Sequence, residues 1–225
     1  MPKKILVVSP HADDELIGLG GSLLKWKLEG HRIKLVLVAC SDIYMRHLDT
    51  HVSSEIREQE FNKSSDVLAT EPYTVLGLTD SRLDCEPIAE LVRALDNELL
   101  EFKPDVYIYP EPSYHQDHQA VNKACTASLR PTTHIRPTTV MTYEIPTSTW
   151  VGSGQPFIPN LYIDISDTVQ QKLDHFETIY TSQFTSSERG KLARDGILTH
   201  AQCRGFEASL KFAEAFKLLF SLGAF

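Results

Sequence analysis

The pattern of hydrophobic and polar positions alternates between short apolar runs and longer amphipathic stretches. Residues 5–8, 33–39 and 106–109 are apolar and rich in β-branched side chains, which is typical of strands buried on both faces. Residues 16–28 and 87–102 instead carry apolar side chains at helical spacing, which predicts amphipathic helices. Strands and helices therefore follow one another in turn, as they do around a parallel sheet.

Two further elements continue this order. Ser53 or Ser54 is a suitable N-cap for a helix that runs through Leu68, and residues 73–76 form a short apolar run typical of a strand. With 225 residues, of which 42% are hydrophobic, the chain is long enough to bury one substantial core. We therefore expect a single Rossmann-like α/β domain over residues 1–225, with a mostly parallel sheet and helices on both faces.

The pattern changes in the C-terminal part of the chain. Residues 146–159 are rich in Pro, Gly, Ser and Thr, and a loop of this length in a compact domain usually serves the site as a lid. The last helix is expected from an apolar stripe at helical spacing that runs from Phe206 to Phe220. The elements predicted here are strands at 138–143 and 161–165, and helices at 166–180 and about 204–219.

Composition excludes several classes of function. The net charge of −8 argues against a nucleic-acid partner, and no stretch approaches the ~20 apolar residues of a membrane span. The four cysteines include no CxxC pair, so neither a disulfide framework nor a thiolate zinc site is expected, and most should be buried reduced thiols. These features predict a soluble cytoplasmic protein.

Candidate chemistry follows two of the predicted strands. The sequence HADDE occupies residues 11–15 and HQDH occupies residues 115–118. Alone, the acids of the first could simply cap a helix, and the second could be a solvated turn. Because parallel strands end at one edge of a sheet, however, the two stretches should meet in one crevice if their strands are near neighbours. Histidine and aspartate from several loops are the ligands of a catalytic zinc, which keeps one position open for water.

These two stretches carry a resemblance to a known family. PHADDE at residues 10–15, together with HQDH, resembles the PIG-L/LmbE family of zinc-dependent N-acetylglucosaminyl deacetylases, and the likeness runs nearly from end to end. It also includes an RxxE helix at 57–60, an acidic loop at 80–84, a YxSQ segment at 180–183 and an AEAF segment at 213–216.

The resemblance implies a metal centre with a neighbouring base. His11, Asp14 and His118 are implied to bind one zinc ion per chain, although an imidazole and carboxylate site does not exclude iron. Asp13 is implied to be the general base, which takes a proton from the attacking water and passes one to the departing amine.

The remaining implied roles concern the oxyanion and the substrate. His115 would face the developing oxyanion as a cation, with Asp117 holding its ring. Asp42, Arg57 and Arg204 are the candidate substrate contacts. Residues 40–44 depart from the acidic, Gly-containing turn usual in the family, and Gln116 stands where proline is common. For Arg57 a surface ion pair within its own helix remains an equal alternative.

Three functions are consistent with the sequence. The resemblance favours a hydrolase that removes the acetyl group from an N-acetylglucosamine-type amino sugar or conjugate and releases acetate, with a homo-oligomer left open. A second candidate is a zinc amidase that acts on a non-sugar acyl amide. A third is a non-catalytic Rossmann-like binding module, but Gly18, Gly20 and Gly21 fall inside the predicted helix and form no phosphate-cradling turn.

Overall fold

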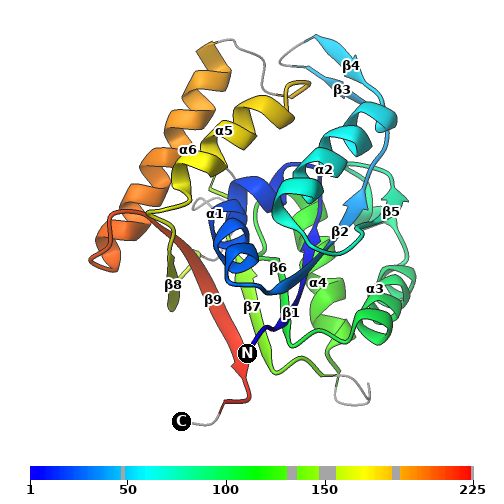
Figure 1. Ribbon diagram of the computed structural model, residues 1–225. Helices are drawn as coiled ribbons and strands as arrows, with labels where there is room; N and C mark the ends of the chain where they lie inside the picture. The colour runs from blue at the N-terminus through cyan, green and yellow to red at the C-terminus, as the bar shows by residue number, and fades with distance from the viewer. Residues whose placement is uncertain (47–48, 131–135, 147–155, 184–187, 224–225) are drawn as a thin grey trace.

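A seven-stranded sheet forms the centre of the chain (Figure 1). The structure is a computed structural model that describes residues 1–46, 49–130, 136–146, 156–183 and 188–223. In spatial order the strands are β5 (Thr74–Leu78), β2 (Arg32–Ala39), β1 (Lys4–Ser9), β6 (Val106–Pro110), β7 (Thr139–Tyr143), β9 (Ala213–Ser221) and β8 (Leu161–Asp164). The first five are parallel, whereas β9 runs antiparallel to both of its neighbours. The expected mostly parallel α/β fold is confirmed.

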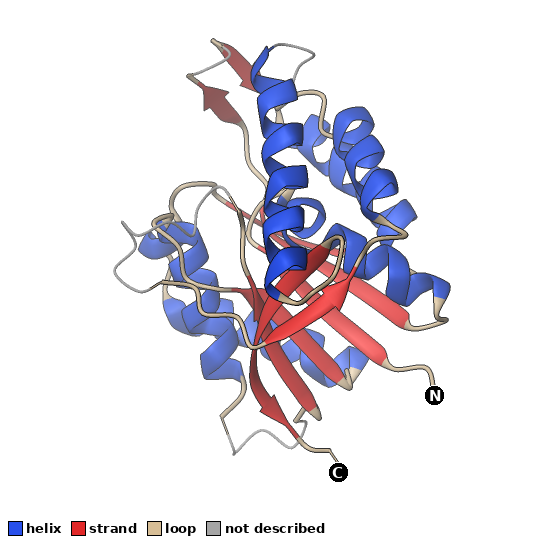
Figure 2. Ribbon diagram, turned by 90° about the vertical axis from the view of Figure 1, so that its left-hand side faces the viewer, coloured by secondary structure: helices blue, strands red, loops and turns tan. Residues whose placement is uncertain are grey.

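Helices cover both faces of the sheet (Figure 2). One core, on the side of Ile5 and Val7, is completed by α1 (Asp14–Leu28), α2 (Ser54–Leu68), α5 (Val169–Ile179) and α6 (Glu188–Glu207). The other, on the side of Leu6 and Val8, is completed by α3 (Ile88–Phe102) and α4 (Gln116–Ser128). Successive residues of β1 thus enter opposite cores, which explains why this strand lacks polar alternation.

The pairing of β1 with β6 positions the candidate chemistry. The two strands are adjacent and parallel, with Ile5 opposite Val106 and Val7 opposite Ile108. The loops that follow them leave the same edge of the sheet, so the predicted meeting of HADDE and HQDH is confirmed. This edge is where open α/β sheets bind ligands.

A small hairpin outside the main sheet was not predicted from the sequence. Strands β3 (Ile43–Met45) and β4 (Thr50–Val52) pair antiparallel and lie apart from the seven-stranded sheet (Figure 1). Each strand has three residues, which is too short for a period-2 pattern to be recognised. The hairpin matters for function because Ile43 and Tyr44 line the pocket described below.

The expected helix at 204–219 is wrong. Helix α6 ends at Glu207, and residues 213–221 form β9, which pairs with β7 on one side and β8 on the other. Phe216 is fully buried there, while Phe206 is exposed on the helix. A short apolar run fits the period of a helix or that of a strand. Here the backbone of residues 213–221 can hydrogen-bond to β7 on one side and to β8 on the other, and this pairing decides in favour of the strand.

Two expectations from composition have mixed outcomes. All four cysteines are free, but only Cys40 and Cys125 are buried, whereas Cys85 and Cys203 are exposed. Within the described ranges, no helix has the length and apolar character needed to cross a membrane. The predicted lid at 146–159 lies largely outside the described residues, since 147–155 are not among them.

Candidate active site and metal centre

A pocket of about 730 Å³ opens at the carboxyl ends of β1 and β6. Its polar floor comes from the two loops, and further walls come from the β3–β4 hairpin, α1, α2, α5 and α6. All of the predicted metal ligands and the predicted base line this pocket: His11, Asp13, Asp14 and His118. The volume lies within the range of small-molecule sites and exceeds what an acetyl group alone would need.

Three ligand atoms from His11, Asp14 and His118 form a nearly equilateral triangle. The Oδ2 atom of Asp14 lies 3.2 Å from His11 Nδ1 and 3.3 Å from His118 Nε2, and the two nitrogens are 3.3 Å apart. Donors about 2.0–2.1 Å from a tetrahedral zinc ion lie roughly 3.3–3.4 Å from one another. The three side chains therefore fit a tetrahedral ion that keeps its fourth position open.

The charges around this triangle favour a cation at its centre. Burial opposes the charged form of His11, but hydrogen bonds with Asp117 and Asp14 outweigh it and raise the pKa of His11 to about 10. Burial alone would raise the pKa of Asp14, yet the neighbouring His118 and His11 hold it well below its usual range. A metal ion must displace this proton, so metal binding should strengthen as the pH rises.

The rings of both histidines are held by hydrogen bonds at the nitrogen that faces away from the triangle. His11 Nε2 lies 2.8 Å from Asp117 Oδ2, and His118 Nδ1 lies 2.8 Å from Ser113 Oγ. Such partners fix the tautomer and orientation of metal-binding histidines. His11 thus has a carboxylate at one ring nitrogen and the metal position at the other.

The expectation that Asp117 holds the ring of His115 is not supported by the contacts. The Asp117 carboxylate also accepts the backbone N–H groups of Ser81 at 2.6 Å and Leu83 at 3.0 Å. His115 instead accepts the backbone N–H of Asp117 through Nδ1, at 3.2 Å. Because Asp117 lies in the first turn of α4, its side chain turns toward the sheet edge and meets His11.

Asp117→Asn is therefore expected to weaken metal affinity by about 10–100-fold, the range known for such outer partners. The amide can still contact His11, but it carries no charge to favour a cation. A competition titration with a chromogenic chelator measures the change. Ser113→Ala is the comparison variant: it removes the neutral partner of His118, which also accepts the His115 N–H, and it leaves the charge of Asp117 in place. Unchanged affinity in Asp117→Asn would contradict this role.

Asp13 is held in a strained backbone conformation. Its φ of 136° lies where glycine is favoured, and its side chain makes no capping hydrogen bond. The alternative that both acids only cap a helix therefore fails for Asp13. Burial and the charge of Asp14 together raise the pKa of Asp13 well above its usual value. A carboxylate kept in such a place despite strain indicates a functional role.

Asp13→Gly is expected to stabilise the metal-free chain at pH 8 by about 1 kcal/mol or more, because it removes the strained φ. Asp13→Asn removes only the charge. Since the folded-state pKa of Asp13 is raised, ionisation costs stability as the pH rises through that pKa, so the gain in Asp13→Asn should shrink toward low pH. Calorimetric Tm values from pH 4 to pH 8 test this. A loss of stability in both variants at pH 8 would contradict it.

Glu15 is a structural hub that sequence reasoning left without a role. Its carboxylate is fully buried and accepts hydrogen bonds from Ser9 Oγ at 3.1 Å, Ser64 Oγ at 2.6 Å, the Asp13 N–H at 3.3 Å and the Tyr180 hydroxyl. Burial raises the pKa of Glu15. The sequence contained an indication of this role. Asp14 is implied to bind the metal and Asp13 to be the base, so the third consecutive acid is left without a part in the reaction.

The segments that resembled family motifs converge on the same loop. The carboxylate of Glu60, from the RxxE helix, accepts hydrogen bonds from the Ser182 N–H at 2.8 Å and from Ser182 Oγ at 2.6 Å. Gln183 Nε2 donates to the Ala12 carbonyl at 2.7 Å, within the HADDE loop. The YxSQ segment therefore braces the metal-binding loop, and among its residues Gln183 also lines the pocket.

Arg57 lines the pocket from α2 and is buried. It forms an ion pair with Asp80 and donates from Nη1 to the Ser41 carbonyl at 3.2 Å, so the alternative of a surface pair with a glutamate of its own helix is not supported. Its Nε has no hydrogen-bond partner among the described residues. The guanidinium is therefore held at the pocket wall by Asp80 and Ser41, and its Nε is buried from solvent.

Two of the three expected substrate contacts lie elsewhere. Asp42 is exposed, and its Oδ1 accepts the Ser54 N–H at 2.7 Å, so it caps α2 instead of facing the pocket. Arg204 forms a two-pronged ion pair with Glu144, at 2.6 Å and 2.8 Å, and also contacts Glu207. Neither residue is among those that line the pocket. The side chain of Asp42 is bound by a backbone N–H, and that of Arg204 by two glutamates.

Comparisons with known proteins agree with this geometry. Residues 6–129, more than half of the chain, match the family described as PIG-L: GlcNAc-PI de-N-acetylase. The diacetylchitobiose deacetylase of Thermococcus kodakarensis is 28% identical over 196 residues, which cover 81% of this chain and 70% of that protein. The probable N-acetyl-alpha-D-glucosaminyl L-malate deacetylase 2 of Bacillus anthracis is 22% identical over 204 residues, which cover 87% and 88%.

A solved structure shows the same fold. The N,N'-diacetylchitobiose deacetylase from Pyrococcus horikoshii, complexed with its inhibitor MPG, has a TM-score of 0.79 at 23% identity, with 96% of this chain and 84% of that chain covered. The fold, the match to the family and the cluster of His and Asp ligands agree. The chain therefore belongs to the PIG-L family of de-N-acetylases, which are hydrolases that act on linear amide bonds.

Proposed function

We propose that this chain is a zinc-dependent N-deacetylase that removes the acetyl group from an N-acetylglucosamine-type amino sugar or sugar conjugate. The observation that supports this best is the triangle of donor atoms from His11, Asp14 and His118, spaced by 3.2–3.3 Å. Beside it lies the partly buried carboxyl of Asp13, which makes no capping hydrogen bond. The named relatives act on acetylated glucosamine derivatives, which supports the substrate class.

The proposed reaction divides the chemistry between the metal and Asp13. Zinc bound by the triangle would act as a Lewis acid toward the amide and make water acidic enough to attack near neutral pH. Asp13 takes the proton from the attacking water and later delivers it to the amine as the C–N bond breaks, which leaves acetate and the free amino sugar. Its raised pKa suits this second step, because a carboxyl that holds its proton more tightly can carry it to the leaving group.

His115 is assigned the role of a neutral hydrogen-bond donor to the developing oxyanion. Burial and the neighbouring His11 and His118 lower its pKa to about 4, which favours the neutral ring over the imidazolium that the resemblance implied. Its Nδ1 accepts the Asp117 N–H, which places the proton of the neutral ring on Nε2. His115 lines the pocket, where such a donor stabilises negative charge.

His115→Ala is expected to keep its metal and to lose about 100-fold in kcat, as in other oxyanion sites. Because the ring gains its second proton only near pH 4, kcat should depend on pH in the same way in wild type and variant from pH 6 to pH 9. His115→Asn, which retains a side-chain cap for α4, controls for helix stability. Loss of an alkaline limb in His115→Ala would instead support the imidazolium.

Arg57 is the proposed substrate contact. Its place on the pocket wall and its positive charge suit a sugar hydroxyl or an anionic group attached to the sugar. Tyr44 from the β3–β4 hairpin and Tyr114 from the loop after β6 are exposed aromatic side chains on the same pocket. Together they supply the mixture of polar and aromatic surface on which a sugar conjugate can bind.

The test is a screen for released amine with the zinc-loaded protein. Its substrates are N-acetylglucosamine, its glycosides, its lipid conjugates and its nucleotide-linked forms, and an N-acetyl peptide of similar size serves as the non-sugar arm. The proposal expects turnover of at least one sugar substrate and background rates with the peptide. Turnover of the peptide without any sugar substrate would contradict the substrate class and favour a non-sugar amidase.

A further inference from the structure

Helix α1 is broken one turn after the metal-binding loop. Leu19 has φ −146° and ψ 17°, which is not helical, although the residues on both sides are. In an unbroken helix the Gly21 N–H would donate to the Ile17 carbonyl. At the break, the Ile17 carbonyl and the N–H groups of Gly21 and Ser22 bond to side chains of other elements, in a buried part of the chain.

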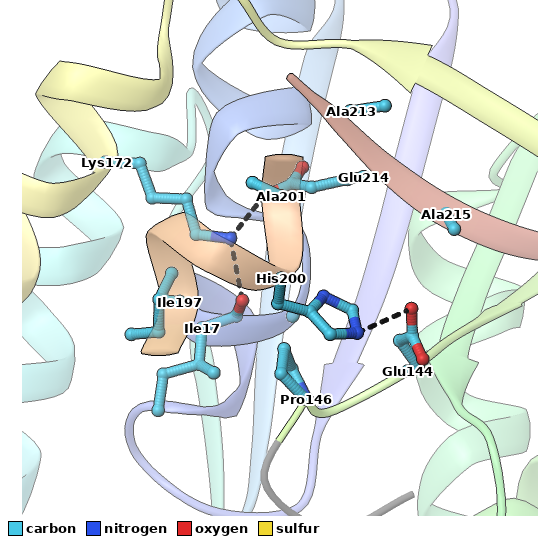
Figure 3. Close-up of a pocket in the computed structure, with 11 residues that line it drawn as sticks. Ile17, Glu144, Pro146, Lys172, Ile197, His200, Ala201, Ala213, Glu214 and Ala215 are labelled. Atoms are coloured by element: carbon cyan, nitrogen blue, oxygen red, sulfur yellow. Dashed lines mark hydrogen bonds and ion pairs between the residues drawn. The ribbon is translucent and has the colours of Figure 1, made fainter. Parts of the chain in front are cut away.

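A buried ion pair is inserted at this break (Figure 3). Lys172 of α5 donates from Nζ to the Ile17 carbonyl at 2.7 Å and to Glu214 Oε1 at 2.6 Å. Glu214 of β9 in turn accepts the Gly21 N–H at 3.0 Å and the Ser22 N–H at 2.7 Å. The pair therefore links the Ile17 carbonyl to the Gly21 N–H through two side chains, and side chains inserted into a helix in this way are a known cause of kinks.

Close packing keeps the second half of α1 at this place. A Cβ on Gly21 would lie 3.0 Å from three side-chain atoms of Ile165, and Thr168 Oγ1 donates to the Gly21 carbonyl at 2.8 Å. Lys172 and Glu214 are only 2% and 4% exposed. The second half of the helix is thus anchored to β9, to α5 and to the segment before α5. The bridge then fixes the direction of the first turn relative to this anchored half.

The first turn is the part of α1 that carries the chemistry. It begins at Asp14 and follows Asp13, and Ile17 lines both the metal-site pocket and a cavity of about 10 Å³ beside the bridge. We propose that Lys172 and Glu214 are positioning residues for the reaction: their bridge holds the turn so that Asp14 completes the metal triangle and Asp13 faces the substrate. This inference rests on the proposed metal site. It also gives the AEAF segment, which contains Glu214, a role in the site.

The variant Lys172→Met/Glu214→Gln tests the bridge without leaving an unpaired buried charge. We expect its zinc affinity to fall about 10–100-fold, and its kcat to fall at least about 10-fold while KM stays within about 2-fold, because small displacements of catalytic groups have large effects on turnover. Zinc affinity is measured on the metal-free chain by chelator competition, and kinetics are measured at saturating zinc with the substrate found in the screen.

A second buried pair supplies the matched control. Lys34 Nζ lies 2.7 Å from Glu98 Oε2, with side chains 13% and 9% exposed, and this pair joins β2 to α3 away from α1. Lys34→Met/Glu98→Gln should lower Tm without changing zinc affinity or kcat. Lys172→Gln replaces the double variant if the latter does not fold. It takes the cation away from Glu214, so the bridge is weakened and zinc affinity should fall in the same direction.

The outcomes separate the inference from the metal site on which it rests. Wild-type zinc affinity and kcat in the Lys172/Glu214 variant, with only Tm lowered as in the control, would show that the bridge is merely structural and would overturn the inference. A wild-type chain with no zinc affinity would contradict the metal site itself, and the inference with it. Reduced zinc affinity confined to the bridge variants supports the inference.

Discussion

Asp13→Asn is expected to lower kcat by ~100-fold or more, the range that general-base catalysis supplies, while metal content stays at the wild-type level. The amide has nearly the volume of the carboxyl but cannot accept the proton of the attacking water. Asp13 contributes none of the three atoms in the 3.2–3.3 Å triangle, so the metal site should survive the change. Amine release and elemental analysis on the same preparation measure both quantities.

Asp14→Asn is the matched comparison for this experiment. It makes the same chemical change one residue later, at the atom that lies 3.2 Å and 3.3 Å from the two histidine nitrogens. Metal loss is therefore expected in Asp14→Asn and not in Asp13→Asn. If Asp13→Asn emptied the site while Asp14→Asn kept its metal, the roles assigned to the two acids would be reversed.

Loss of any one metal ligand is expected to lower kcat by at least about 1,000-fold. His11→Ala and His118→Ala each remove one corner of the triangle, and a metal centre supplies several kcal/mol of transition-state stabilisation, at 1.36 kcal/mol per tenfold in rate. Elemental analysis of protein purified without added metal should show about one zinc or iron per wild-type chain and little in the variants. Chelation of the wild type should reproduce the loss, and added zinc should reverse it.

His175→Ala is the control for these variants, since it removes a histidine of α5 that is outside the residues lining the pocket. It should keep both metal and activity. Full activity in a wild-type preparation that contains no metal would contradict the metal centre as a whole. Metal retained in His11→Ala with turnover lost would instead assign that residue to another step.

Much of the fold followed from local pattern. Runs such as residues 5–8 are too apolar to face water on either side, so they had to become central strands, and the helices between them followed from spacing and caps such as Ser53. The same pattern placed HADDE and HQDH at the ends of two parallel strands. Their meeting at one edge was expected for neighbouring parallel strands, and the ligand set His11, Asp14 and His118 was implied by the resemblance to the PIG-L/LmbE family.

Other features depended on which partner lay nearest in space. The apolar run at 213–221 fits a helix or a strand, and only the gap between β7 and β8 made it β9. Asp42 and Arg204 looked like substrate contacts until the Ser54 N–H and Glu144 proved to be their neighbours. Residue type limits the chemistry of a charged side chain, but its role is set by the groups it meets.

The sequence by itself thus determined the α/β class, the edge of the sheet that holds the chemistry and the residues able to bind a metal, because these depend on periodicity and on ligand type. The tertiary structure decided that the Asp117 carboxylate contacts His11, that His115 lies against the two histidines that lower its pKa, and that Lys172 and Glu214 bridge the break in α1. Hydrogen bonds and pKa shifts fall off within a few ångströms, so they depend on distances between residues far apart in the chain, which no local pattern encodes.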